Sequence, residues 1–261
     1  NSLAALIFDL QGRAEEARFF AKMTVASHGE RERGHTGNYF SYLWGPVGAW
    51  RGGAEATPAF LKEQRWYYDL ARAHDGSFPY QGGAGMSGGE HQYGKWDCTG
   101  AFVLANTFPL AKLYMTGRGR TPALDFERGE VVEAVAAGAG FHSWDLGAAH
   151  YAAMETPELI DLLGSWSPAV RSRAATALAK KNGVPVTTLV EMLKGGSMEA
   201  RYGACQALGA LKGKAASAVG ELTGALGEDD VWLRIQAAYA LAGIGDKARP
   251  AVPELLKLAL R

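Results

Sequence analysis

Small and apolar residues recur at helical spacing in the last hundred or so residues of the chain. Three segments, 170–178, 200–208 and 233–241, align on a shared pattern of arginine, two alanines and leucine. In each segment the second alanine and the leucine follow the first alanine by three and four residues. They therefore share one narrow helical face that admits a close neighbour.

A leucine-rich stretch precedes each of these segments, at residues 159–163, 189–193 and 222–226, and a fourth begins at 252. Neither helix of such a hairpin can bury its apolar stripe alone, so neighbouring hairpins have to stack. The pattern predicts about three and a half two-helix repeats that form a right-handed α-solenoid over residues 156–261.

The earlier part of the chain, residues 1–155, predicts helices joined by long glycine-rich connections. Residues 57–74 begin with threonine and proline, which predicts a cap followed by proline at the first helical position. Residues 98–115 are apolar nearly all round, which predicts a helix buried on most sides. Because no alternating strand pattern occurs, the predicted fold class is all-α, with domains 1–155 and 156–261.

The aligned segments resemble the short HEAT-like repeats of the phycobilisome-lyase type. The features that carry the resemblance are Arg-x-x-Ala-x-x-Ala-Leu and a following glycine, as in Leu241-Ala-Gly-Ile-Gly-Asp. Repeats of this kind occur across unrelated functions. The resemblance therefore implies a non-catalytic binding scaffold rather than lyase chemistry.

Three segments in the first domain resemble the inner-helix starts of an α/α toroid of the terpene-cyclase and prenyltransferase-β kind. They are His35-Thr-Gly-Asn-Tyr-Phe, Asp75-Gly-Ser-Phe and Asp97-Cys-Thr-Gly-Ala-Phe. The order of such a domain followed by HEAT-like repeats resembles an uncharacterised bacterial domain family. The resemblance implies an alternative function, an enzyme that acts on a carbohydrate or isoprenoid-like substrate by acid/base chemistry.

The candidate catalytic residues of that enzyme are His35, Asp75 and Asp97, because the inner-helix starts of a toroid converge on one mouth. Two carboxylates and an imidazole in one place can perform general acid/base work. The structural alternative is that the two aspartates cap helices and His35 bonds to backbone. Aromatic rings of the same region would stack on sugar rings or stabilise a cation. These candidate ligand-binding residues are Tyr39, Trp44, Trp50, Tyr80 and Trp96.

Arg171, Arg201 and Arg234 occupy the same position in successive repeats and form a ladder. Such a ladder can bind an anionic partner. The alternative is hydrogen bonding to a neighbouring acid or helix end inside the solenoid. Asp229 and Asp230 precede the third arginine and fit that alternative as acids at a helix start.

Asp97 and Cys98 invite comparison with the Asp-x-Cys zinc ligands of protein prenyltransferases. Here the two residues are adjacent, so on a helix their side chains diverge by about 100°. We therefore expect no metal, with Asp97 as a helix cap and Cys98 as a small hydrophobe in the core. His142 and His150, with Asp145 between them, are not expected to bind one metal, because eight helical residues span about 12 Å. His142 and Asp145 stay candidates for a local hydrogen-bonded pair.

Residues 83–88 match Gly-x-Gly-x-x-Gly, and residues 85–89 match Gly-x-Ser-x-Gly. Both motifs require a strand before them and a helix after them. That context is missing, so the segment is interpreted as a turned or flexible loop. Gly37 and Gly100 follow threonine in similar contexts, which predicts a close approach of neighbouring chain at both glycines.

Charge and composition narrow the choice of partner. The 27 basic residues balance 27 acidic residues, so no broad positive field favours nucleic acid. No apolar run approaches the ~20 residues of a membrane span. Two distant cysteines exclude a disulfide scaffold and leave the compartment open. The sequence starts without methionine and is interpreted as an excised piece. We expect no cofactor, and a partner that is another protein or a small or carbohydrate ligand.

Overall fold

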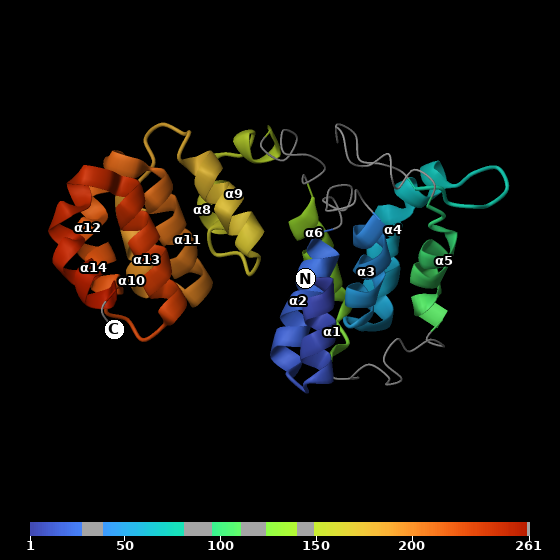
Figure 1. Cartoon of the computed structure of the whole chain (residues 1–261). Helices are drawn as coiled ribbons and strands as arrows, with labels where there is room; N and C mark the ends of the chain where they lie inside the picture. Colours follow the sequence, from blue (N-terminus) through green and yellow to red (C-terminus); the bar gives the residue numbers. More distant parts are fainter. Residues whose placement is uncertain (28–38, 81–95, 111–123, 140–148, 260–261) are drawn as a thin grey trace. The chain divides into compact units, whose positions relative to one another are not determined.

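The computed structural model describes residues 1–27, 39–80, 96–110, 124–139 and 149–259 (Figure 1). Over these residues the protein is all-α, as predicted, and it contains no strand beyond an isolated bridge between Pro79 and Asp97. In the same residues, no helix combines the length and apolar character that crossing a membrane requires. Two compact units divide the chain, unit 1 at Asn1–Trp144 and unit 2 at Asp145–Arg261.

Unit 1 is a layered set of helices in which α3 takes the central place. Its described elements are α1 (Ser2–Leu10), α2 (Ala14–Ala26), α3 (Tyr39–Trp50), α4 (Gly53–Ala71), α5 (Thr99–Thr107), η3 (Phe108–Leu110) and α6 (Arg128–Gly138). Helix α3 packs against α1, α2, α4 and α5, while α6 packs against α2 and α4. An aromatic core joins α3, α4 and α5, and Tyr80 and Cys98 of the α4–α5 connection belong to it.

Helix α4 begins at Gly53, four residues earlier than the sequence predicts. Gly53 has a φ of +91°, and a Cβ at this position would lie 2.1 Å from Oδ1 of Asp125. Thr57, the predicted cap, instead lies inside the helix, where its buried hydroxyl donates to the carbonyl of Gly53 at 3.3 Å. The prediction of this boundary was wrong because a contact between residues distant in sequence sets the helix start.

Helix α5 is buried on one side rather than on most sides. Phe102 and Ala105 are buried, whereas Val103 is 51% exposed. A Cβ at Gly100 would meet no atom within 4 Å, so the predicted close approach at this glycine was wrong. Gly37 lies outside the described residues.

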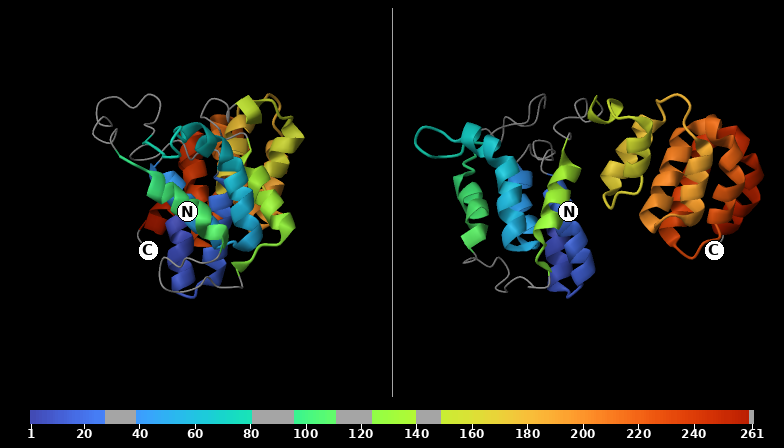
Figure 2. Two further views of the ribbon diagram at one scale, coloured as in Figure 1. Left: turned by 90° about the vertical axis from the view of Figure 1, so that its right-hand side faces the viewer. Right: turned by 180° about the vertical axis from the view of Figure 1, so that it is seen from behind.

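Unit 2 is a two-layer stack of helical hairpins, which confirms the predicted solenoid (Figure 2). Its elements are α8 (Thr156–Leu162), α9 (Pro168–Leu178), α10 (Val186–Gly195), α11 (Met198–Ala210), η5 (Lys212–Ala218), α12 (Val219–Ala225), α13 (Val231–Ile244), η6 (Gly245–Ala251) and α14 (Val252–Ala259). Helices α8, α10, α12 and α14 form the first layer, and α9, α11 and α13 stack in the second layer. The three hairpins and α14 match the predicted three and a half repeats.

The aligned residues explain why the hairpins stack. The alanines and leucines of the shared pattern are all buried. Each second-layer helix also starts with a side-chain cap four residues before its arginine, and these caps are Ser167, Ser197 and Asp230. Each cap accepts a hydrogen bond from the backbone N–H three residues further on, which satisfies a donor that the helix itself leaves open.

Candidate functional site

The connection between α4 and α5 brings Asp75 and Asp97 close to each other. The backbone N–H of Cys98 donates to the carbonyl of Phe78 at 2.8 Å, and that of Tyr80 donates to Trp96 at 3.0 Å. The two chain segments therefore run antiparallel. The negative charge of Asp75 reaches Asp97, where it only partly offsets the hydrogen bonds from Thr99 that lower the pKa of that carboxyl.

Each aspartate folds its own turn through a local Asp-x-Ser/Thr pattern. Asp75 Oδ1 accepts hydrogen bonds from the backbone N–H and the hydroxyl of Ser77, at 2.9 and 2.6 Å. Asp97 Oδ1 accepts from the N–H of Thr99 at 2.8 Å, the first residue of α5. The N-cap residue of α5 is Cys98, without a side-chain capping bond, so neither aspartate is the helix cap that the structural alternative predicted, and both stabilise turns.

The same hydrogen bonds hold the pKa of both carboxyls below their ordinary value. For Asp75 the donors belong to Ser77, and for Asp97 they belong to Thr99. Both carboxylates are therefore ionised at neutral pH. In glycoside hydrolysis one of the paired carboxyls acts as a general acid and has a raised pKa, a condition that neither aspartate meets. A catalytic role for this cluster with His35, which lies outside the described residues, stays a prediction.

We expect Ser77→Ala to raise the pKa of Asp75 toward its ordinary value, because the variant removes the largest stabilising hydrogen bond to the carboxylate. A carboxyl with a lowered folded-state pKa contributes stability above its unfolded pKa, and the contribution is lost as pH falls through the folded value. NMR titration of the Asp75 carboxyl measures the change. Ser77→Thr keeps a hydroxyl and serves as the control, and an equal pKa in the alanine variant would contradict the assignment.

Three of the five predicted ligand-binding aromatics gather beside the two aspartates. The ring of Trp96 meets those of Tyr39 and Tyr80, with centroids 5.7 and 6.3 Å apart. Trp96 is 40% exposed, so it offers a face to a ligand. Trp44 and Trp50 instead pack in a separate cluster against α1. The structure does not bring these two tryptophans to the aspartates, and ligand binding by the other three stays a prediction.

Cys98 is a buried free thiol, as the sequence predicts. Burial, together with the charge of Asp97, raises the pKa of the thiol to about 11, so it stays protonated at neutral pH. No group of three or more His, Cys, Asp or Glu side chains within the described ranges is placed to hold a metal ion. The glycine motifs at 83–89, as well as His142 and Asp145, lie outside those ranges.

The arginine ladder of unit 2 bonds to acceptors within the solenoid. Arg171 Nη1 donates to the carbonyls of Ser165 and Trp166. Arg201 donates to the carbonyl of Leu193 and forms an ion pair with Glu228 at 2.7 Å. Arg234 Nη1 donates to the carbonyls of Glu228 and Asp229. These bonds match the alternative role that the sequence analysis gave for the ladder, which is hydrogen bonding inside the solenoid.

The three arginines of the ladder differ in how deeply they are buried. Arg171 is 4% exposed, and burial lowers the pKa of its guanidinium. Arg201 and Arg234 are partly exposed. Binding of an anionic partner by this ladder stays a prediction.

A hollow runs across the second layer of unit 2. Its volume is ≈410 Å³, and it spans α9, α11 and α13. Thr176, Gln206 and Tyr239 line it, and each is the fifth residue after the arginine of its repeat. The side-chain amide of Gln206 also donates to Gln236 at 3.3 Å, which links two repeats. This column lies within the three aligned segments, but the sequence analysis did not single it out because its residue types differ from repeat to repeat.

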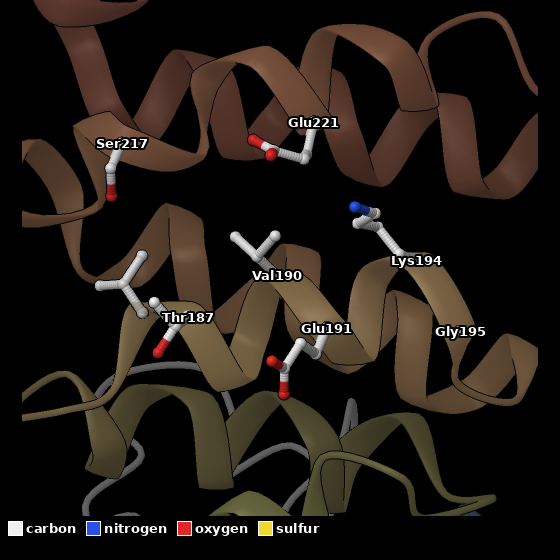
Figure 3. A pocket seen from close by; sticks show the side chains of 8 residues that line it. Thr187, Val190, Glu191, Lys194, Gly195, Ser217 and Glu221 are labelled. Atoms are coloured by element: carbon white, nitrogen blue, oxygen red, sulfur yellow. The ribbon is translucent and has the colours of Figure 1, made fainter.

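A second hollow lies in the first layer, between α10 and the η5–α12 segment (Figure 3). Its volume is ≈530 Å³. We call it the α10–α12 groove, and its lining residues are Val186, Thr187, Val190, Glu191, Lys194, Gly195, Ser217 and Glu221. Sequence reasoning did not detect this groove, because one wall depends on the 3₁₀ course of η5.

Comparison with known families agrees with the division of the chain. Residues 156–242 and 186–261 match the HEAT repeats family, and residues 1–117 match a domain of unknown function, DUF6288. The second part of the chain is therefore a helical repeat scaffold. The finer resemblances, to repeats of the phycobilisome-lyase type and to an α/α toroid, stay predictions. Comparisons with curated proteins and with solved structures give no match.

Proposed function

We propose that the chain is a protein-binding scaffold whose HEAT repeats hold a partner along the hollow of the second layer. The observation that carries this proposal is the column of Thr176, Gln206 and Tyr239, which aligns three repeats on one hollow. Stacked repeats of this kind present extended surfaces, and such surfaces suit an extended partner better than a compact ligand.

The chemistry of the hollow supports a protein partner. Ala175, Gly209 and Gly243 lie in its lining, and the two glycines let α11 and α13 pack closely, since a Cβ at Gly243 would lie 2.6 Å from the carbonyl oxygen of Gly209. Gln206 and Gln236 bring amide groups that can donate to and accept from peptide groups. Tyr239 is 71% exposed, and tyrosine is enriched among residues that dominate binding energy at interfaces.

The experiment uses the full chain to capture a partner from an extract of the source cells, followed by titration with the purified partner. We expect Tyr239→Ala to weaken binding about ten-fold or more, the effect of losing one central aromatic residue. Trp232→Ala is the matched control, because Trp232 is also exposed on α13 but does not line the hollow. Equal affinity for Tyr239→Ala and the parent chain, or an equal loss in the control, would refute the proposal.

A further inference from the structure

The hollow of the second layer has an uncharged lining. Of the described residues that line it, from Ser172 on α9 to Gly243 on α13, none is acidic or basic. Cys205 is among them, and burial raises the pKa of its thiol to about 12, so the thiol stays protonated at neutral pH. A charged group of a partner would lose its water here without gaining an opposite charge, which is costly. The lining therefore favours an uncharged segment.

Two neighbouring amides in this hollow have hydrogen-bonding groups that the fold does not use. Gln206 Nε2 donates to Oε1 of Gln236 at 3.3 Å, which joins α11 to α13. Within the described part of the chain, Oε1 of Gln206 is shielded from solvent and accepts no hydrogen bond. In the same part, the amide nitrogen of Gln236 donates to no protein atom. A shielded acceptor without a donor is costly, and a bound group that supplies the donor removes this cost.

One acceptor beside one donor matches the polar groups of a polypeptide main chain. Every peptide group other than that of proline has an N–H that donates and a carbonyl that accepts. In a partner helix these groups bond to one another along the helix, so an extended segment is the form that offers them to a second protein. Ser172 adds a hydroxyl from α9, which can donate to or accept from the same main chain.

We propose that this hollow binds an extended, uncharged segment of the protein partner and recognises it by its main chain. Oε1 of Gln206, turned toward the hollow, accepts from an N–H of the segment, and the amide nitrogen of Gln236 donates to one of its carbonyls. Recognition of this kind tolerates many different side chains, provided that they are uncharged. The inference rests on the proposed function, because that function places a protein partner along the hollow.

The test uses fluorescein-labelled peptides of one length, and anisotropy with the full chain measures their affinities. The first peptide is built from serine, threonine and valine. The second has the same sequence with methyl groups on alternate peptide nitrogens, and two more carry lysine or glutamate at alternate positions. We expect the first peptide to bind at least about ten-fold more tightly than the others and to keep its affinity as salt rises. Equal binding of the N-methylated peptide would overturn the proposal, as would tighter binding of a linear oligosaccharide of glucose.

Gln206→Leu removes the amide and keeps a side chain of similar size. We expect this variant to bind the first peptide about ten-fold more weakly. Gln11→Leu removes an exposed amide just after α1, outside the hollow, and should bind like the parent. Undiminished binding by Gln206→Leu would contradict main-chain recognition. A thermal melt shows whether Gln206→Leu folds, and if it does not, the comparison of the unmodified and N-methylated peptides decides.

The same variants separate this inference from the proposed function. If Tyr239→Ala weakens binding of the purified partner but Gln206→Leu does not, the main-chain recognition is wrong and the proposed function stands. If neither variant weakens it, both are wrong.

Discussion

Replacing Arg51 by methionine is expected to lower the free energy of unfolding of unit 1 by about 3–5 kcal/mol. Arg51 Nη1 donates to Oδ2 of Asp9 at 2.7 Å, and both side chains are at least 95% buried. This ion pair ties α1 to the end of α3. Without the guanidinium, the carboxylate of Asp9 loses its opposite charge inside the protein, where desolvation of a charge is costly.

An exposed pair on the same unit gives the control. Arg65 and Asp69 of α4 form an ion pair at 3.2 Å, but their side chains are 79% and 66% exposed. Solvent screens such a pair, so Arg65→Met should change stability by less than about 1 kcal/mol. Urea denaturation of both variants measures the difference. If Arg51→Met and Arg65→Met both lower stability only slightly, the other contacts of Asp9 compensate for the missing guanidinium and the prediction is wrong.

The repeats could be predicted because their signal is local and occurs three times. Ala174, Ala177 and Leu178 share a face by helical spacing alone, and two further copies confirm the pattern. The start of α4 could not be predicted in the same way. It depends on the approach of Asp125 to Gly53, across 72 residues, and no local signal records that contact.

The α4–α5 connection shows the same division between local and distant causes. The turns at Asp75 and Asp97 follow from hydrogen bonds to residues two positions ahead, so their signal is local, although the sequence analysis interpreted both aspartates as helix caps. Trp44 and Trp50 carry no comparable signal, because the face of α3 that meets α1 is decided by tertiary packing. Aromatic composition alone therefore placed five rings together where the structure brings three.

Gly203→Ala is expected to destabilise unit 2 by about 1–3 kcal/mol, although alanine is the better helix former by about 0.5–1 kcal/mol. A Cβ at Gly203 would lie 2.0 Å from the carbonyl oxygen of Leu163 and 2.7 Å from its carbonyl carbon. These are backbone atoms at the end of α8, so the clash can be relieved only by shifting one hairpin against the next. The steric cost therefore exceeds the gain in helix propensity.

The repeat alignment does not explain this glycine, since the equivalent positions in the other repeats are Arg173 and Gln236. The close contact with the backbone of Leu163 requires glycine at position 203. Gly220→Ala in α12 is the matched control, because a Cβ there would meet no atom within 4 Å. Thermal and urea denaturation should show opposite signs, with Gly203→Ala lowering stability and Gly220→Ala leaving it unchanged or raising it by up to about 1 kcal/mol. If Gly203→Ala stabilises unit 2 as much as the control does, the two hairpins pack less closely than the structure shows.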